Sequence, residues 1–519
     1  MLQKVNRSAK KNGSESKKKP CPGAVDSESK AWYNRLDARF GQILSIRTDH
    51  RMKHYTKAEL FGRVPIPRAL LAMAVPTIIS QLINLIYNMV DAFFIGRTGN
   101  SYMMAATTIT LTLTMMNVAF ANLFGVGGGS HIARLMGQKR EEEARRVSAY
   151  SCRGAICLGI CYAAVTALFM DPILDFLGAS DATLGFARQY TVYVIVLGTT
   201  PTIFSLTLAH LLRNAGYASQ ASLGLSMGGV LNMLLDPLFM FVLLPRGQEV
   251  TGAALATLLS NLFSCVYLLF AYLRSSKAAP LSLHLLRHAR KLEREHVRAV
   301  FSVGVPSALL TGLFDLASIS VNKLASAHND LVLAGMGIVM KVERIPNAVN
   351  IGLCQGMMPI VAYNFASGDR ERMHSAVRTA RLWGLTVSAV SILLLELLAR
   401  PVTNLFLSTT RSDAREALLT IGYATVFLRI RALASPVQFI NYHTSFCMQA
   451  IGSGKATLLH AAVRELGIYI PLMILLDRLF GENGLAAALP VGEGLAAIFA
   501  LFLLHYVLKR ARQAGRSSS

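Results

Sequence analysis

The chain has 519 residues, of which 53% are hydrophobic and 16% are charged, whereas soluble domains carry about 25% charged residues. This composition argues against a soluble globular protein and indicates a membrane protein. The formal net charge of +23 could suggest nucleic-acid binding, but the basic residues lie mainly between apolar stretches, which indicates a role in membrane topology instead.

The first 64 residues form a polar, Lys-rich segment that contains KKNGSESKKK. No apolar signal-peptide core precedes the first apolar stretch, and the low hydrophobicity predicts disorder. We expect residues 1–64 to be a cytoplasmic tail that sets the topology by its charge. The alternative is that this tail lies on anionic lipid headgroups.

About twelve stretches are long enough to cross a bilayer, which takes roughly 20 largely apolar residues. They are 69–95, 102–126, 148–170, 187–210, 219–244, 251–273, 300–325, 331–361, 379–399, 416–447, 457–477 and 484–507. These stretches lack the period-two alternation of a transmembrane β-strand, which needs only about 10 residues. We therefore expect an all-α integral membrane protein.

The basic connections follow the second, sixth and eighth spans, and both termini are basic as well. By the positive-inside rule these connections face the cytoplasm. One connection on the opposite side, RPVTNLFLSTTRSDAR, carries three arginines against this pattern. We expect a multi-pass protein of the cell inner (plasma) membrane with both termini in the cytoplasm.

The first span contains polar residues in NLIYNMVDAFFIG. Asn84, Asn88 and Asp91 are spaced i, i+4 and i+7, so they share one stripe of a helix. An aspartate at the centre of a spanning helix costs about 2.5–3.5 kcal/mol on insertion scales. Asp91 therefore needs a partner or a proton.

The fifth and sixth spans supply partners for this stripe. Asn232 and Asp236 in LNMLLDPLF are again i, i+4, and Thr257 follows in GAALATLLS. Two carboxylates, several amides and a hydroxyl could form a hydrated pocket that binds protons or a hard cation such as sodium. The alternative is that the amides only join helices through hydrogen bonds of about 0.6 kcal/mol each.

The two halves repeat each other at an offset of about 230 residues, which predicts two six-helix bundles related by a pseudo-two-fold axis along the membrane normal. The bundles would be 65–273 and 299–508, with a cytoplasmic linker 274–298, a basic cytoplasmic tail 509–519 and a cavity between the bundles. Pro201 and Pro436 are expected to kink the fourth and tenth spans. The matching pairs are Pro76 with Pro306, Gly127 with Gly356, Gly216 with Gly452, and Gly252 with Gly484.

The second half carries both acids and bases inside its spans. One interpretation is a substrate cavity; the other is a structural network of ion pairs, because neighbouring opposite charges neutralise each other. The candidates for the cavity are Lys341, Glu343, Arg429, Gln449, Arg464 and Glu493, and the further charged residues are Arg344, Glu396, Arg431 and Glu465.

Over residues 65–508 the chain resembles the multidrug and toxic compound extrusion (MATE) family, and more narrowly its bacterial DinF-like branch. The motifs that carry the resemblance are YNMVDAFFIG, GVGGGSHIARLMGQ, LRNAG, LNMLLDPLF, GAALATLLSN and CQGMMPIVAYNFASGD. The resemblance implies a V-shaped pair of six-helix bundles that exports cationic amphipathic compounds against an inward flow of protons or sodium ions.

The resemblance also implies where the coupling ion binds. Family members place that site in the N-terminal bundle, at positions matched by Asp91, Asn232, Asp236 and Thr257. This chain has amides at 84 and 88, where some members have a second acid, and that favours protons over sodium. The branch's arginine in the eleventh helix is matched by Arg464.

Two alternatives remain. A flippase for a lipid-linked or polysaccharide substrate would have a strongly cationic central cavity. An intramembrane enzyme would need a catalytic motif, but the sequence has no HExxH. A nucleotide-driven pump would need a GxxxxGK[ST] loop, which the sequence also lacks. We expect a transporter, not an enzyme, that needs no cofactor and binds no nucleic acid. Its expected partners are small organic cations, protons or sodium ions and membrane lipids, and we expect a monomer.

Overall fold

The computed structural model describes residues 57–283, 293–407 and 414–516. These residues form helices, with no strand among them, and belong to one compact unit, Thr56–Ser519. Helix α2 (Lys57–Gly62) falls within the segment assigned to the disordered tail. Phe61 of α2 is fully buried, and its carbonyl accepts hydrogen bonds from Asn364 and Arg372. The structure therefore differs from the predicted disorder at this position, while residues 1–56 lie outside the described part.

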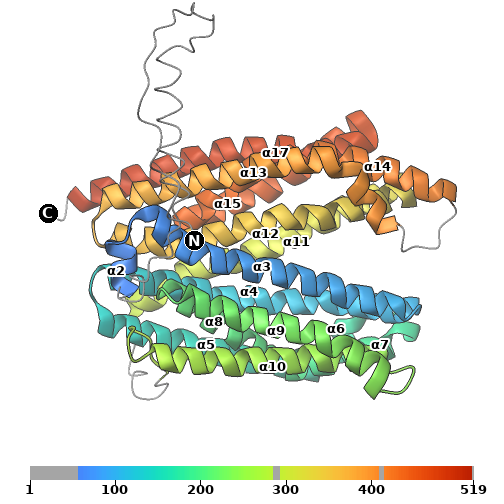
Figure 1. Cartoon of the computed structure of the whole chain (residues 1–519), viewed down its shortest axis with the longest axis horizontal. Helices are drawn as coiled ribbons and strands as arrows, with labels where there is room; N and C mark the ends of the chain where they lie inside the picture. The colour runs from blue at the N-terminus through green and yellow to red at the C-terminus, as the bar shows by residue number, and fades with distance from the viewer. Residues whose placement is uncertain (1–56, 284–292, 408–413, 517–519) are drawn as a thin grey trace, which may run out of the picture. The chain divides into compact units, whose positions relative to one another are not determined.

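The helices of the first half lie together, and α12 to α17 of the second half lie together beside them (Figure 1). The first half consists of α3 (Ile66–Arg97), α4 (Ser101–Gly137), α5 (Glu141–Leu168), α6 (Met170–Phe176), α7 (Asp181–Thr191), η2 (Val192–Leu197), α8 (Thr199–Asn214), α9 (Ala218–Leu238), η3 (Phe239–Leu243) and α10 (Glu249–Ser275). The second half consists of α11 (Arg294–His328), α12 (Asp330–Ala366), α13 (Arg370–Leu407), α14 (Ala414–Ala432), α15 (Ser435–Ala450), α16 (Gly454–Ala462), η4 (Val463–Tyr469) and α17 (Ile470–Arg516).

The number of membrane-length helices agrees with the predicted number of spans. Among the described residues, eight helices are long and apolar enough to cross a membrane, and two bent pairs bring the number to ten. The 37-residue helix α12 is long enough, but Lys341, Glu343 and Arg344 interrupt its apolar sequence. The helical segment Gly454–Ala511 is one of these eight, but it is broken at Gly481, where the backbone has the non-helical angles φ 59° and ψ −145°. It therefore consists of two successive helices. With α12 and the second of these helices included, the predicted twelve spans are accounted for.

The two bent spans confirm the predicted kinks. The chain bends by 48° between η2 and α8, close to Pro201, and by 50° between α14 and α15, close to Pro436. A proline has no N–H to donate to the preceding turn, and its ring clashes with that turn, so a helix bends or breaks there.

The internal repeat also appears in the helix caps. The side chain of Asn100 accepts from the backbone N–H groups of Tyr102 and Met103 at the start of α4. The side chain of Asn329 accepts from Val332 N at the start of α12. Asparagine is a preferred N-cap because its oxygen satisfies a donor that has no partner within the helix. The equivalent helices of the two halves therefore begin in the same way.

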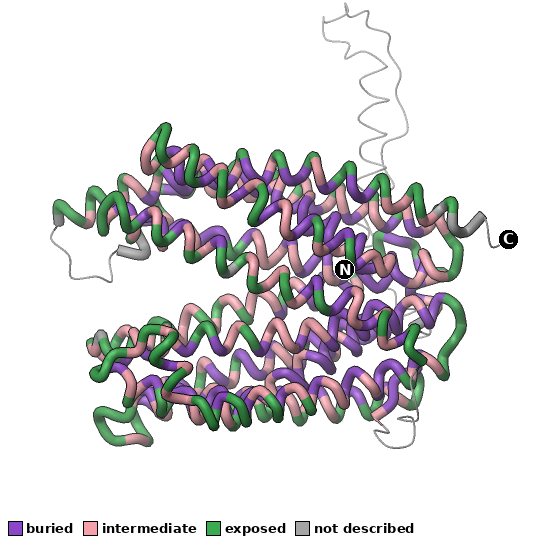
Figure 2. Tube along the Cα trace, turned by 180° about the vertical axis from the view of Figure 1, so that it is seen from behind, coloured by how far each residue is buried: buried purple, intermediate pink, exposed green. Residues whose placement is uncertain are grey.

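The described residues have three hydrophobic cores. The largest contains buried residues of both halves, such as Leu70 and Met357. A second core lies wholly within the second half and a third wholly within the first half. In Figure 2 the buried residues concentrate toward the end at which the two halves meet, and more exposed residues lie at the other end. The two bundles therefore share a core at one end and have separate cores at the other.

Small residues allow the bundles to approach at the shared end. The main helix pairs across the halves are α4 with α11 and α3 with α12. A Cβ on Gly127 of α4 would lie 3.0 Å from the Cα of Gly304 on α11, and a Cβ on Gly356 of α12 would lie 2.6 Å from the Cα of Ala74 on α3. Because α4 corresponds to α12 and α11 to α3, the two contacts are equivalent under the repeat.

Candidate functional site

Four of the residues expected to couple ion binding lie on three helices of the first bundle. Asn232 Nδ2 donates to Asp236 Oδ1 at 3.1 Å, within α9, and also to Thr257 Oγ1 of α10 at 3.4 Å. Asp91 of α3 lies within electrostatic range of Asp236, and α3 packs along α9. The structure thus brings Asp91, Asn232, Asp236 and Thr257 into one polar cluster, which we call the N-bundle cluster.

Three oxygen atoms of the N-bundle cluster are buried without a hydrogen-bond partner in the described part of the chain. They are Asp91 Oδ1, Asn232 Oδ1 and Asp236 Oδ2. A buried acceptor without a donor costs about 1–3 kcal/mol, and more when it is charged. All three atoms are oxygens, the ligand type that hard cations prefer. The cluster can therefore accept a proton or a small hard cation.

The backbone next to the cluster is irregular. Pro237 follows Asp236 inside α9, and the helix continues as the π-helical turn η3. Since proline removes one backbone donor, a carbonyl one turn upstream loses its usual partner. Single π-helical turns inside α-helices occur frequently at functional sites. The irregularity places a segment that can change its hydrogen bonding beside Asp236.

Two tyrosines near the cluster were missed from the sequence. Tyr190 of α7 is buried, hydrogen-bonds with Thr257 and lies within electrostatic range of both Asp91 and Asp236. Tyr87 of α3 also lies within electrostatic range of both carboxylates. The i, i+4 spacing between Tyr87 and Asp91 could have indicated the first tyrosine. Nothing in the local sequence around Tyr190 indicates that it reaches the cluster.

The other two candidates of the first span form a separate contact. Asn88 Nδ2 donates to the backbone oxygen of Asn84 at 2.6 Å and to Asn84 Oδ1 at 2.8 Å. Both side chains are exposed. These bonds run along α3 rather than between helices. The structure therefore does not bring Asn84 and Asn88 into hydrogen bonds with the N-bundle cluster.

Charged candidates of the second half form a buried network. Arg464 of η4 makes two bonds to Glu493 of α17, at 3.0 Å and 2.5 Å, and lies 3.5 Å from Glu465. Asn441 of α15 donates to Glu493 Oε2 at 2.6 Å, and His460 of α16 contacts Asn441 at 3.1 Å. Removing one partner from a buried ion pair is strongly destabilising because it leaves a charge uncompensated. The geometry favours the structural interpretation for Arg464 and Glu493.

The remaining candidates of the second half lie outside the hydrogen bonds of the Arg464–Glu493 network. Glu343 of α12 accepts two bonds from Arg431 of α14, at 2.8 Å and 2.9 Å, and both side chains are buried. Lys341 and Arg429 are exposed. Gln449 lies at the end of α15, where its backbone oxygen accepts from Ser130 Oγ and Arg134 Nη1 of the other half. The six candidates for a substrate cavity therefore do not all gather in one place, although Tyr469 bonds to Arg431 and lies within electrostatic range of both Glu343 and Glu465.

A chain of polar groups joins the two halves at their shared end. His296 Nε2 of α11 lies 3.0 Å from Glu143 Oε2 of α5, and His296 Nδ1 lies 2.9 Å from His131 Nε2 of α4. A hydrogen bond between two imidazoles needs one donating ring nitrogen and one accepting ring nitrogen. This chain fixes the relative position of α11 against α4 and α5.

Two helix bundles that share a core at one end, with a buried polar cluster inside one of them, are the arrangement of a membrane transporter built from repeats. The chain belongs to the MatE family, whose family model matches it twice, over residues 76–238 and 306–475. The two matches begin at Pro76 and Pro306, the first pair of the internal repeat. This confirms the resemblance to the MATE family.

The curated relatives are multidrug exporters. The chain is 27% identical to the multidrug export protein MepA of Staphylococcus saprophyticus over 462 residues, which cover 89% of this chain and 97% of that protein. It is also 27% identical to MepA of Staphylococcus haemolyticus over 463 residues, with the same coverage.

Solved structures share the fold. A multidrug resistance MATE family transporter of the MOP superfamily, described in an outward-facing conformation, aligns with a TM-score of 0.82 and 22% identity, over 88% of this chain and 99% of that one. A MOP superfamily transporter from Pyrococcus furiosus, described as having a binding pocket of reverse polarity, aligns with a TM-score of 0.80 and 22% identity over the same shares.

Proposed function

We propose that this protein is a secondary active multidrug antiporter that exports cationic amphipathic compounds in exchange for protons or sodium ions. The observation that carries the proposal is the set of three buried oxygens without a donor on Asp91, Asn232 and Asp236. The names of the curated relatives support export of multiple drugs.

The mechanism couples the charge of the N-bundle cluster to the packing of its helices. With Asp91 and Asp236 both ionised, the two carboxylates repel each other, and the cluster attracts water and a cationic compound. A proton or a sodium ion neutralises part of this charge and allows α3 to pack closer to α9. An ion can shift the equilibrium between two conformations only if it binds one of them more tightly.

Access to the N-bundle cluster follows from the positions of the cores. Asp91 lies toward the end of α3 where each bundle has its own core, away from the glycine contacts. The basic connections lie at the shared end, which is the cytoplasmic end under the positive-inside rule. In that orientation the cluster is reached from outside the cell, where a coupling ion enters and an exported compound leaves.

The test is efflux of a fluorescent organic cation from proteoliposomes, with a proton gradient or a sodium gradient imposed separately. Wild-type protein should export the dye under one gradient, and Asp91→Asn should not. Asp175→Asn makes the same change at an exposed position and should transport like wild type. Export by a well-folded Asp91→Asn variant at the wild-type rate would refute the proposed role, and failure of both gradients would refute the proposed antiport.

A second candidate is a flippase for a lipid-linked or polysaccharide substrate that carries negative charge. Lys341 and Arg344 are exposed although they lie within the membrane-length helix α12. Cations at such positions face the bundle interior or water rather than lipid. If the substrate is anionic, replacing both residues by glutamine should abolish its transport, whereas export of an organic cation should persist.

A further inference from the structure

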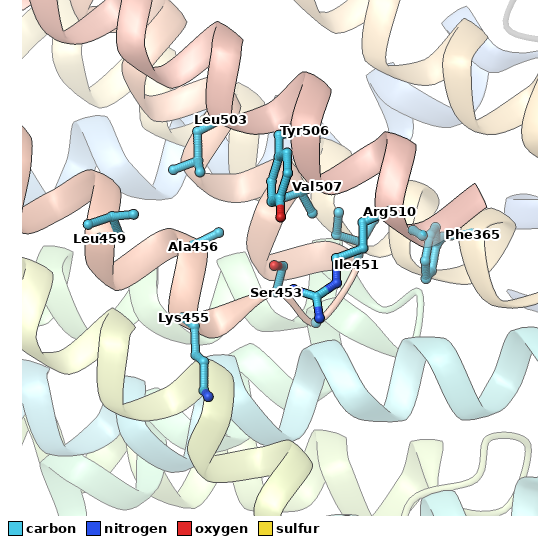
Figure 3. Close-up of a pocket in the computed structure, with 12 residues that line it drawn as sticks. Phe365, Ile451, Ser453, Lys455, Ala456, Leu459, Leu503, Tyr506, Val507 and Arg510 are labelled. Atoms are coloured by element: carbon cyan, nitrogen blue, oxygen red, sulfur yellow. The ribbon is translucent and has the colours of Figure 1, made fainter. Parts of the chain in front are cut away.

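A cavity of about 490 Å³ lies at one end of the second bundle, away from the N-bundle cluster. Its wall is formed by the end of α12, the loop before α16, α16 itself and the last turns of α17 (Figure 3). Most of the lining side chains are apolar, among them Leu459, Leu503 and Val507. Two cations, Lys455 and Arg510, also line it, and the described lining residues include no acid. The cavity therefore combines an apolar wall with positive charge that no carboxylate of the lining neutralises.

The polar groups gather on one side of this cavity. In Figure 3 the guanidinium of Arg510 and the hydroxyl of Tyr506 both point toward Ser453, whereas the side chain of Lys455 extends away from these three groups. A guanidinium and two hydroxyls are donors that suit the oxygens of a phosphate group. The apolar side chains lie next to them, on Leu459 of α16 and Leu503 of α17.

The flank of α17 that leads to the cavity is apolar and exposed. Ile498 and Phe502 are each 70% exposed, and Tyr506 is 54% exposed. With Arg510 they are spaced by four residues and lie on one stripe of the helix. Such a stripe on a membrane-spanning helix faces lipid chains. A tyrosine followed by an arginine is typical of the level of the lipid headgroups.

We propose that this cavity binds an anionic glycerophospholipid of the surrounding bilayer. Its phosphate lies between Arg510, Tyr506 and Ser453, with Lys455 adding positive charge at longer range, and an acyl chain lies along Leu459 and the exposed flank of α17. The position at the basic ends of the helices places the phosphate in the cytoplasmic leaflet under the orientation proposed above. A bilayer lipid explains both the charge and the apolar wall, whereas a free phosphate ion would use only the charge.

The test is native mass spectrometry of the full-length protein in detergent, titrated with dioleoyl phosphatidylglycerol or dioleoyl phosphatidylcholine. Each basic residue near a lipid surface contributes about 1 kcal/mol, which is about fivefold in affinity. We expect Arg510→Gln to weaken retention of phosphatidylglycerol about fivefold, and Arg510→Gln with Lys455→Gln about 30-fold. Arg510→Lys, which keeps the charge, should retain most of the binding.

Lys509→Gln is the matched control, because Lys509 is the exposed neighbour of Arg510 on the same helix and does not line the cavity. It should leave retention near the wild-type value. Equal losses for Lys509→Gln and Arg510→Gln would overturn the proposal, because they would indicate general surface attraction. Equal retention of phosphatidylcholine, or displacement of the lipid by inorganic phosphate, would also overturn it. The assay involves no transport, so its outcome is independent of the proposed antiport.

Discussion

The contact between α4 and α11 can be tested with a pair of identical substitutions on α11. A Cβ added at Gly304 would lie 2.0 Å from the carbonyl oxygen of Leu123 on α4, whereas real Cβ contacts essentially never fall below 3.0 Å. At Gly312 on the same helix, an added Cβ would have no atom within 4 Å. Gly304→Ala must therefore push the two helices apart by about 1 Å. A displacement of this size is a substantial perturbation of a close-packed contact.

The difference between the two variants isolates this steric effect. Both substitutions raise helix propensity by about 1 kcal/mol, so that gain cancels in the comparison. Overpacking of a close contact costs about 1–3 kcal/mol. Relative to Gly312→Ala, Gly304→Ala should thus disfavour the conformation with the shared end closed by about 5- to 150-fold.

Double electron–electron resonance can measure this population shift in a cysteine-free background. Spin labels at position 102 on α4 and position 479 on α17, both exposed in this structure, would report the distance between the two bundles at the end with separate cores. Gly304→Ala should add a second, shorter distance, and Gly312→Ala should keep the wild-type distribution. Identical distributions for the two variants would refute the view that close glycine packing holds the shared end closed.

Further predictions concern stability, measured by thermal unfolding in detergent. Arg431→Met leaves Glu343 buried without its partner and should lower the free energy of unfolding by about 3–5 kcal/mol, while the double variant Arg431→Met with Glu343→Leu should recover most of the loss; if the double variant is as unstable as the single one, the ion pair is not the cause. Asp171→Asn removes a pair with Arg188, 2.6 Å apart and about half exposed on each side, and should cost less than about 1 kcal/mol; a larger loss would show that exposure is a poor guide here. Asn100→Ala removes the cap of α4 and should cost about 1 kcal/mol, with faster hydrogen exchange of the two amides that it caps, and unchanged exchange would contradict the cap.

The spans, the repeat and the principal ionisable residues could be predicted because membranes impose strict local constraints. A spanning helix needs a long apolar stretch, and a carboxylate within it is too costly to occur without a reason. Asp91 and Asp236 therefore stand out from the sequence alone. The kinks near Pro201 and Pro436 were predictable for a similar reason, since proline acts within its own helix.

The partners of these residues were harder to predict because they depend on packing between distant helices. Tyr190 reaches the N-bundle cluster from α7, and the sequence around it carries no sign of that contact. The spacing that puts Asn84 and Asn88 on the stripe of Asp91 is correct, yet these amides bond to each other along the helix. The spacing of residues along a helix determines the direction in which their side chains project. It does not determine which neighbouring helix lies in that direction.

The charges of the second half show the same limit. Their mixture allowed either a substrate cavity or a structural network, and only the three-dimensional arrangement shows that Arg464 bonds to Glu493 and Arg431 to Glu343. Residues far apart in the chain form these pairs, so sequence spacing carries no information about them. For the same reason, the sequence alone could not show that Lys341 and Arg429 are exposed whereas the residues of these pairs are buried.

The paired contacts of α4 with α11 and α3 with α12 have the form of an isologous interface, in which the same surface occurs on both partners. In this respect the two halves of the single chain pack against each other as the two subunits of a homodimer do. Because the two halves belong to one chain, their sequences can differ at equivalent positions. The N-bundle cluster is a place where they do differ. At the repeat offset, the position of Asp91 is occupied in α11 by Val321, which is buried in an apolar core. The scaffold has kept its two-fold relation, whereas the ionisable chemistry at this position belongs to one copy alone.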